Sequence, residues 1–305
     1  MPSVSLHPTR CAICGTEGNA SELYPANFDL DAFNPAVFSA RRMPDRVHYR
    51  MVRCLECGLV RSDPVADSGA LAQLYAQSSF DYGEEVENLN RTYARYLAEL
   101  DRYGVRKDSL LEIGCGNGFF LKEALRHGYA AARGVEPSSA AIEQADPLVR
   151  DGIARDVMRP GLFEPVSIDV VCLFQVLDHI PDPSEVLREC FHVLRPGGFV
   201  LCLNHNVESI SARLLKAGSP IVDIEHTYLF SPATMDRLFG DHGFEVKSTI
   251  AVFNRYSLLY LTRLLPLPKS IKSEVLGALK KTRMGSIPMW VPLGNLCTVA
   301  RKPGG

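Results

Sequence analysis

The sequence has no uninterrupted apolar run of the length that a membrane-spanning helix requires, and residues 1–10 lack the apolar segment of a secretory signal. It also lacks an excess of positive charge, because 33 Lys and Arg face 35 Asp and Glu and the formal net charge is −2. Internal repeats and low-complexity tracts are absent too. These absences predict a cytoplasmic protein without a transmembrane segment and give no support for a nucleic-acid partner.

The length of 305 residues, 46% of them hydrophobic, exceeds that of a usual single domain and supplies a substantial core. Residues 1–65 carry two cysteine pairs around a polar stretch punctuated by prolines, and we expect them to form a small module. Residues 66–305 are expected to form the main domain, beginning with a helical lead-in at 66–105. Cap-like insertions are expected at 206–230 and 254–290.

From Ser109 onward, short apolar runs alternate with longer amphipathic segments, which is typical of a parallel sheet with crossover helices. The expected strands are 110–113, 132–135, 152–154, 168–173, 199–203, 244–252 and 296–300. The expected helices run from the glycines to about His127, from Ser138 or Ser139 to before Pro147, from a cap at Ser184 to about Leu194, and over 231–243. The pattern predicts an α/β fold with a doubly wound, mostly parallel, seven-stranded Rossmann-like sheet.

A glycine loop follows the first expected strand, in the run Glu112-Ile113-Gly114-Cys115-Gly116-Asn117-Gly118. Glycine lets backbone N–H groups approach a ligand closely at the start of a helix. The dinucleotide pattern is Gly-x-Gly-x-x-Gly, whereas here the third glycine comes one residue early and Phe119 follows. The spacing therefore argues against a cofactor that carries a pyrophosphate.

Two carboxylates follow later strands at the same edge of the expected sheet. Glu136 ends the second strand, where it can accept hydrogen bonds from both ribose hydroxyls of an adenosyl group, and Asp156 follows the third, where it can accept from the adenine amino group. Each landmark also has a purely structural alternative: a tight turn for the glycines, a surface carboxylate for Glu136 and an ordinary loop for Asp156. Together, at successive strand ends, they favour an adenosyl pocket.

These motifs resemble the class I S-adenosylmethionine-dependent methyltransferases over roughly residues 70–253. The matching residues are Leu111 to Gly118, Glu136, Asp156, Phe174-Gln175-Val176-Leu177-Asp178-His179-Ile180 and Val193 to Gly198. In that family the glycine loop lies against the amino acid part of the cofactor, the carboxylate matching Glu136 binds ribose, and the segment matching Phe174-Gln175 borders the methyl group. Many relatives carry glutamate where this chain has Asp178.

The resemblance gives a set of expected cofactor contacts. They are Glu112, Gly114, Cys115, Gly116, Gly118, Glu136, Pro137, Asp156, Val157, Phe174 and Gln175.

The two cysteine pairs are Cys11-x-x-Cys14 and Cys54-x-x-Cys57, with 39 residues between them. Four thiolates suit a closed, tetrahedral, structural zinc site, so we expect a small N-terminal zinc ribbon that acts as a staple or shapes the substrate entrance. A redox dithiol, unbound thiols and another metal are the alternatives. The other five cysteines stand singly in apolar segments, as small buried hydrophobic residues do: Cys115, Cys172, Cys190, Cys202 and Cys297.

Methyl transfer to a hydroxyl needs alignment above all and gains from a base. The candidates are His179 after the fourth strand, His205 at the end of the fifth, and His226 in the connection that follows. Tyr82 is a candidate lid residue. For His179 the plainer alternative is a hydrogen bond to a neighbouring loop.

The stretch 256–267 is rich in leucine but too short and too interrupted to span a bilayer. We expect it to form a substrate cap or a homodimer contact. With Arg255, Arg263 and Lys269 nearby, contact with a membrane surface or a lipid-linked substrate is the alternative.

Zinc ribbon, helices and core in this order resemble bacterial methyltransferases of sugar, polysaccharide and other small-molecule biosynthesis. We therefore expect methyl transfer from S-adenosylmethionine to a small-molecule acceptor, such as a nucleotide-linked sugar or a glycan intermediate. The alternatives are an RNA methyltransferase that grips nucleic acid with the ribbon, and a non-catalytic module that retains the cofactor pocket.

Overall fold

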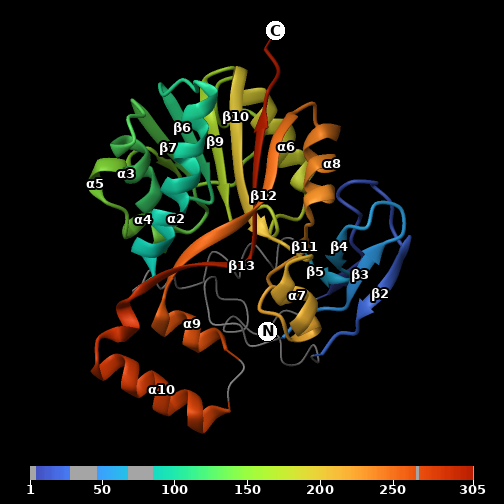
Figure 1. The fold of residues 1–305 in the computed structure, drawn as a ribbon. Coiled ribbons are helices and arrows are strands. Elements are labelled where there is room, and N and C mark those ends of the chain that lie inside the picture. The colour runs from blue at the N-terminus through green and yellow to red at the C-terminus, as the bar shows by residue number, and fades with distance from the viewer. Residues whose placement is uncertain (1–4, 28–46, 68–84, 266–267, 305) are drawn as a thin grey trace.

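The computed structural model describes residues 5–27, 47–67, 85–265 and 268–304. Its centre is a seven-stranded sheet in the order β12-β13-β10-β9-β6-β7-β8, shown in Figure 1. The strands are β6 (Ser109–Ile113), β7 (Ala131–Val135), β8 (Ile153–Ala154), β9 (Ile168–Phe174), β10 (Leu194–His205), β12 (Glu245–Ser257) and β13 (Pro288–Arg301). Only β13 runs antiparallel to both of its neighbours. The predicted fold class is confirmed.

Helices cover both faces of this sheet (Figure 1). On one face lie α2 (Val86–Ala98), η2 (Glu99–Tyr103), α3 (Phe119–Arg126), α4 (Ser139–Glu143) and α5 (Pro147–Arg150), and on the other α6 (Pro183–Val193) and α8 (Pro232–Asp241). Strand β9 shows why both faces need a cover, since all seven of its residues are buried. Val171 and Leu173 belong to the cluster under α6 and α8, whereas Val170 and Cys172 belong to the cluster under α2 and α3.

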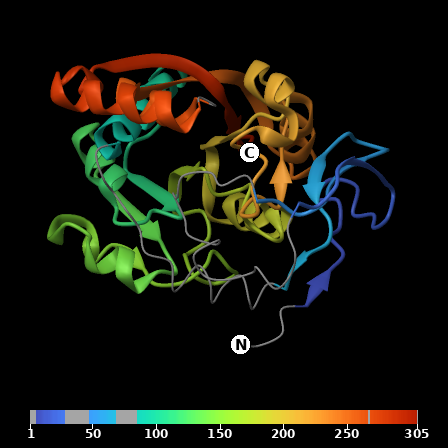
Figure 2. The same cartoon turned by 90° about the horizontal axis from the view of Figure 1, so that it is seen from below.

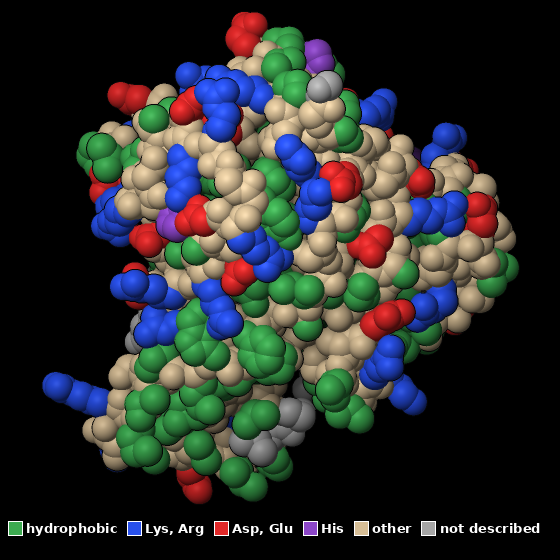
Figure 3. Space-filling view, turned by 45° about the horizontal axis from the view of Figure 1, so that its top comes forward, with side chains coloured by type: hydrophobic (Ala, Val, Ile, Leu, Met, Phe, Trp, Pro, Cys, Tyr) green, Lys and Arg blue, Asp and Glu red, His purple; other side chains and the backbone are tan. Residues whose placement is uncertain are grey.

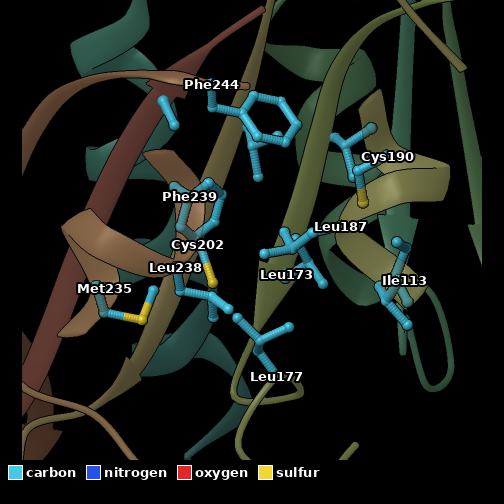
Figure 4. Packing of buried hydrophobic residues seen from close by; sticks show 14 of the residues in the cluster. Ile113, Leu173, Leu177, Leu187, Cys190, Cys202, Met235, Leu238, Phe239 and Phe244 are labelled. Carbon is cyan, nitrogen blue, oxygen red and sulfur yellow. The ribbon is translucent and has the colours of Figure 1, made fainter. Parts of the chain in front are cut away.

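The core under α6 and α8 is packed from sheet and helices alike (Figure 4). Leu173 and Cys202 come from neighbouring strands, Leu187 from α6, and Leu238 and Phe239 from α8. This apolar layer fixes the two helices on the sheet and so positions the loops at its carboxyl edge.

The start of α6 differs from the prediction. Asp182 is the N-cap, because its side chain accepts a hydrogen bond from the Glu185 backbone N–H, and Pro183 takes the first helical position. Ser184, the expected cap, instead donates its hydroxyl to the Ala12 carbonyl at 3.0 Å. Ser138 caps α4 as expected.

A second sheet joins the N-terminal segment to a later part of the chain. Its order is β11-β4-β3-β2, and the strands are β2 (Ala20–Tyr24), β3 (Met51–Cys54), β4 (Val60–Ser62) and β11 (Tyr228–Leu229). A short pair, β1 (Leu6–His7) with β5 (Val65–Ala66), lies beside it. The segment 206–230, predicted as a cap, therefore supplies the edge strand of this sheet as well as α7 (Ile210–Leu215) and η3 (Lys216–Gly218).

Strands β12 and β13 are longer than predicted. Their pairing continues past the last residues of β10 to Ser257 opposite Pro288, where α9 (Leu258–Leu264), α10 (Lys269–Lys281) and η4 (Met284–Ser286) form a lobe. Figure 2 shows α10 on the opposite side of the molecule from the N-terminal strands. The segment 254–290 is thus a β-ribbon that carries a helical lobe.

Candidate functional site

The glycine loop connects β6 to α3 at the carboxyl edge of the sheet. Gly114, Gly116 and Gly118 all have positive φ, at 71°, 56° and 69°. A Cβ at Gly114 would lie 2.5 Å from Cγ2 of Val176, so no larger side chain fits there without displacing the loop after β9. The loop therefore holds its backbone close to the residues that follow β9.

Glu136 connects the ends of two neighbouring strands. Its buried carboxylate accepts hydrogen bonds from the Gly116 N–H at 2.9 Å and from the Ser138 N–H at 2.8 Å. Glu112 is also buried, within β6, whereas Pro137 is exposed directly after Glu136. An anionic acceptor thus sits beside the glycine loop, as an adenosyl pocket requires.

Gln175 lies where β9 ends, in a conformation that its surroundings impose. Its φ is 57°, and its N–H donates to the Leu203 carbonyl at 2.8 Å. Its side-chain Oε1 is buried and has no hydrogen-bond partner among the residues that the structure describes. A left-handed backbone costs about 1–3 kcal/mol outside glycine, and an unmet buried acceptor adds to that cost. Both features fit a residue that awaits a ligand, so this edge suits the cofactor.

Phe174 forms an aromatic wall beside Gln175. Its ring stacks on Tyr93 of α2 with 4.2 Å between centroids and meets Phe120 edge-on at 4.7 Å. The role of Tyr93 was not visible in the sequence beyond its helical spacing, because the stack joins segments 81 residues apart.

Three other expected cofactor contacts lie in different surroundings: one is paired, one is exposed and one is buried. The Asp156 carboxylate is paired with Arg159 at 2.7 Å, which lowers the pKa of this carboxyl, and Val157 is 55% exposed. Cys115 is buried, and a Cβ at Gly134 would lie 2.3 Å from its sulfur. Burial raises the pKa of the Cys115 thiol well above its usual value, so this residue is a neutral packing group.

Asp178, three residues beyond Gln175, forms a cluster with three histidines. Asp178 is fully buried, and its Oδ2 lies 2.5 Å from His205 Nδ1, while its Oδ1 lies 3.8 Å from His179 Nε2. The His226 ring is 4.7 Å from the His179 ring and 4.5 Å from the His205 ring, between centroids. The structure therefore brings all three candidate histidines together.

Backbone carbonyls orient two of these rings. His179 Nδ1 lies 3.0 Å from the Glu225 carbonyl, and His226 Nδ1 lies 2.8 Å from the Ile221 carbonyl. Since a carbonyl only accepts, Nδ1 of each ring carries a proton, and in a neutral His226 the lone pair is therefore left on Nε2. The loop contact considered as the alternative for His179 is thus present, inside the cluster.

Burial and neighbouring charges favour a neutral His226 and an ionised Asp178 within the cluster. Burial, and then the neighbouring His205 and His179, lower the pKa of His226 well below its usual value, so this ring stays neutral. Burial opposes ionisation of Asp178, but His179 and His205 outweigh it and hold the pKa of that carboxyl well below its ordinary range. A neutral imidazole beside a buried carboxylate is the arrangement of a general base. Tyr82, the candidate lid residue, lies outside the described residues.

The four N-terminal cysteines form a second cluster, with their sulfurs within 4.8 Å of one another. All nine cysteines of the chain are free thiols. The two knuckles are alike, since Gly15 N–H donates to the Cys11 carbonyl and Gly58 N–H to the Cys54 carbonyl, both glycines having positive φ. Four converging thiols without a disulfide fit a structural zinc ion.

The cysteine knuckles lie against the main sheet's helices. Besides the bond from Ser184 to Ala12, the Tyr228 hydroxyl donates to the Arg10 carbonyl at 3.1 Å. Cys11 and Cys54 belong to the same apolar cluster as Leu187 of α6. Loss of the metal would therefore disturb the packing beside α6 as well as the ribbon.

Asp178, His179 and His226 could also hold a metal, because one ligand atom of each lies within 4.8 Å of the others.

Within the described ranges, no helix is long and apolar enough to cross a bilayer.

A family model described as a methyltransferase domain matches residues 85–249. Among curated proteins, a ubiquinone biosynthesis O-methyltransferase of Cupriavidus pinatubonensis is 28% identical over 171 residues, 52% of this chain and 68% of that protein. A protein of the same name from Neisseria meningitidis is 24% identical over 200 residues, 60% of this chain and 84% of that protein. A putative methyltransferase structure from Bacillus halodurans has a TM-score of 0.49 and 14% identity, over 68% of this chain and 98% of that chain.

Elemental analysis of protein purified without chelator should find about one zinc per chain. Cys54→Ser should remove most of it and lower the unfolding temperature, because three thiolates no longer close the tetrahedron. Cys190→Ala removes an equally buried thiol outside the cluster and should retain the metal. A metal-free wild type would contradict the zinc site, and a second equivalent would favour a metal at Asp178, His179 and His226.

The lowered pKa of His226 predicts a loss of stability in acid. Its pKa is about 6.5 in the unfolded chain, which therefore binds the proton more readily than the folded protein. Stability is then complete above about pH 6.5 and falls, by up to about 1.4 kcal/mol per pH unit, below it. Urea unfolding between pH 5 and 8 should show this slope and a flatter one for His226→Gln. Equal slopes in the wild type and in His226→Gln would contradict a buried neutral His226.

Proposed function

Because this chain belongs to the methyltransferase domain family and is an S-adenosylmethionine-dependent methyltransferase, we propose that it methylates a hydroxyl of a small biosynthetic intermediate. The observation that carries the proposal is the buried His226, whose ring nitrogen lies within 4.8 Å of an Asp178 carboxylate oxygen at the edge where β9 and β10 end and whose pKa burial lowers. The relatives named ubiquinone biosynthesis O-methyltransferase support an oxygen acceptor on a small molecule. A nucleotide-linked sugar or a glycan intermediate is the acceptor class that we favour.

The residues assigned to the cofactor lie at three strand ends, and those at each end contact a different part of it. The glycine loop lies at the amino acid part, Glu136 binds the ribose hydroxyls, and Gln175 and Phe174 border the methionine end. When bound, S-adenosylmethionine supplies the methyl group on a positively charged sulfur. Glu136 already accepts two backbone N–H bonds, and Gln175 offers an unmet acceptor, so the protein holds these groups in place before binding.

His226 removes the proton of the acceptor. S-adenosylmethionine held at this edge would supply its methyl group to the acceptor oxygen and be left as the neutral thioether that keeps the electron pair of the methyl–sulfur bond. The hydroxyl proton of the acceptor would pass to His226 Nε2. The Ile221 carbonyl holds the other ring nitrogen, and the negative Asp178 stabilises the imidazolium that forms.

The arrangement of the cysteine module bears on the RNA alternative. Its knuckles contact α6 and Tyr228, and the Ser62 hydroxyl donates to the His226 carbonyl at 2.8 Å. These contacts favour a module that supports the base over one that grips nucleic acid. A salt-dependent gel shift with RNA would revive that alternative.

Glu136→Gln should weaken S-adenosylmethionine binding by about ten- to hundredfold, because the amide loses the charge-assisted bonds to ribose. Isothermal titration calorimetry measures the effect. Glu143→Gln, on the exposed part of α4, is the matched control and should bind as the wild type does. Unchanged affinity in Glu136→Gln would remove this residue from the cofactor site.

His226→Gln should lower kcat by about 10²- to 10⁴-fold while leaving cofactor affinity unchanged, since the variant lacks a base but keeps the pocket. The assay follows S-adenosylhomocysteine release over a panel of hydroxyl acceptors that includes catechols and nucleotide-linked sugars. His242→Gln, at the C-cap of α8, is the control. Cofactor binding without turnover on any acceptor would favour a non-catalytic module instead.

A further inference from the structure

The lobe at the end of the β12–β13 ribbon, residues 254–265 and 268–291, leaves much of its apolar surface uncovered. Seven of its hydrophobic side chains are between 36% and 50% exposed: Leu265, Ile271, Val275, Met284, Ile287, Met289 and Trp290. Figure 3 shows these kinds of side chain gathered on the projecting lobe. An area of this kind marks a binding surface more often than an ordinary exterior.

Helix α10 shows the division of the lobe into two faces. Ile271 and Val275, one helical turn apart, are exposed, whereas Leu276 and Leu279 are half-buried. Inside the lobe, Leu259 packs against Gly285, and Lys272 Nζ donates to the Arg263 carbonyl at 2.9 Å. The lobe thus has a small core of its own and still presents apolar side chains outward.

The lobe is also strongly basic in a chain that is slightly acidic overall. Between residues 255 and 283 the sequence has seven Lys and Arg and one Glu, against a net charge of −2 for all 305 residues. Lys280 and Lys281 end α10, and Arg283 follows two residues later. At the other side of the patch, the Arg95 guanidinium of α2 lies 4.9 Å from the centroid of the Trp290 ring.

We infer that this lobe docks on the surface of an anionic lipid bilayer. Exposed aliphatic side chains beside lysines and arginines, with a tryptophan at their border, match the apolar and charged layers of such a surface. The lobe is too short to cross the bilayer, so it would lie on it. A second copy of the chain fits less well, because a symmetric contact through this lobe would bring two basic lobes together.

Docking by this lobe would fix the orientation of the molecule. Figure 1 shows α9 and α10 beyond the carboxyl ends of the parallel strands, the same end of the sheet at which the glycine loop lies. The cofactor edge would therefore be held near the bilayer. This inference does not depend on the acceptor or on the base.

Co-sedimentation tests it with the full chain and two vesicle types, phosphatidylcholine alone and phosphatidylcholine with about one third phosphatidylglycerol. The wild type should bind the second type and be released by salt. Lys280→Ser combined with Lys281→Ser should weaken binding by about ten- to thirtyfold, and Ile271→Ser combined with Val275→Ser should weaken it comparably. Arg126→Ser, an exposed charge on α3, should not change it.

Circular dichroism and calorimetric S-adenosylmethionine binding show that each variant remains folded. Equal sedimentation with both vesicle types, or wild-type binding by both lobe variants, would overturn the inference. So would a wild-type dimer in analytical ultracentrifugation that Ile271→Ser with Val275→Ser dissociates, because the face would then be an interface between copies. Salt-sensitive RNA binding that the lysine variant abolishes, without vesicle binding, would overturn it in favour of nucleic acid.

Discussion

The pairing of the buried Asp178 carboxylate with His205 is the interaction on which the rest of the site depends. A fully buried carboxylate is tolerated only when charges and hydrogen bonds surround it. Here His205 meets Oδ2 with a hydrogen bond, whereas Oδ1 has only the His179 imidazole at 3.8 Å and no hydrogen-bond partner among the described residues. The backbone carbonyl of the same residue accepts from the N–H groups of Thr227 and Tyr228 at 2.9 and 3.1 Å. Asp178, in the loop after β9, thereby fixes the position of His205 at the end of β10, of the loop that carries His226 and of β11.

Through β11 this constraint extends to the N-terminal module. Tyr228 pairs with Arg61 in β4, and the Arg61 side chain is fully buried with its Nε 3.1 Å from the Thr9 hydroxyl. The hydroxyl of the next residue, Ser62, donates a hydrogen bond to the His226 carbonyl. Strand β4, which begins three residues after Cys57, thus supports the backbone of the proposed base. The cysteine cluster is in this way connected to the methyltransferase site.

The sequence allowed the sheet and its glycine loop to be predicted because their signals are local. A buried strand, positive-φ glycines and a carboxylate at the next strand end each leave a pattern within a few residues. The histidine cluster leaves none, since Asp178, His205 and His226 are joined only by the crossing of strands and a long loop. Pairing of β11 with β4 was equally hidden. The misplaced cap of α6 was a local error: Asp182 and Ser184 are both capping residues, and Pro183 between them decides the start.

The two-stranded ribbon beyond β10 has a consequence for how this family member can diversify. Ser257 and Pro288 face each other, so the chain leaves the ribbon and returns to it at adjacent points. The register of β12 and β13 is set further back, where Val252 lies opposite Asn295 and both residues are buried. Residues beyond the ribbon can therefore change in length and composition without shifting the sheet. The catalytic core and its outlying lobe are free to evolve at different rates.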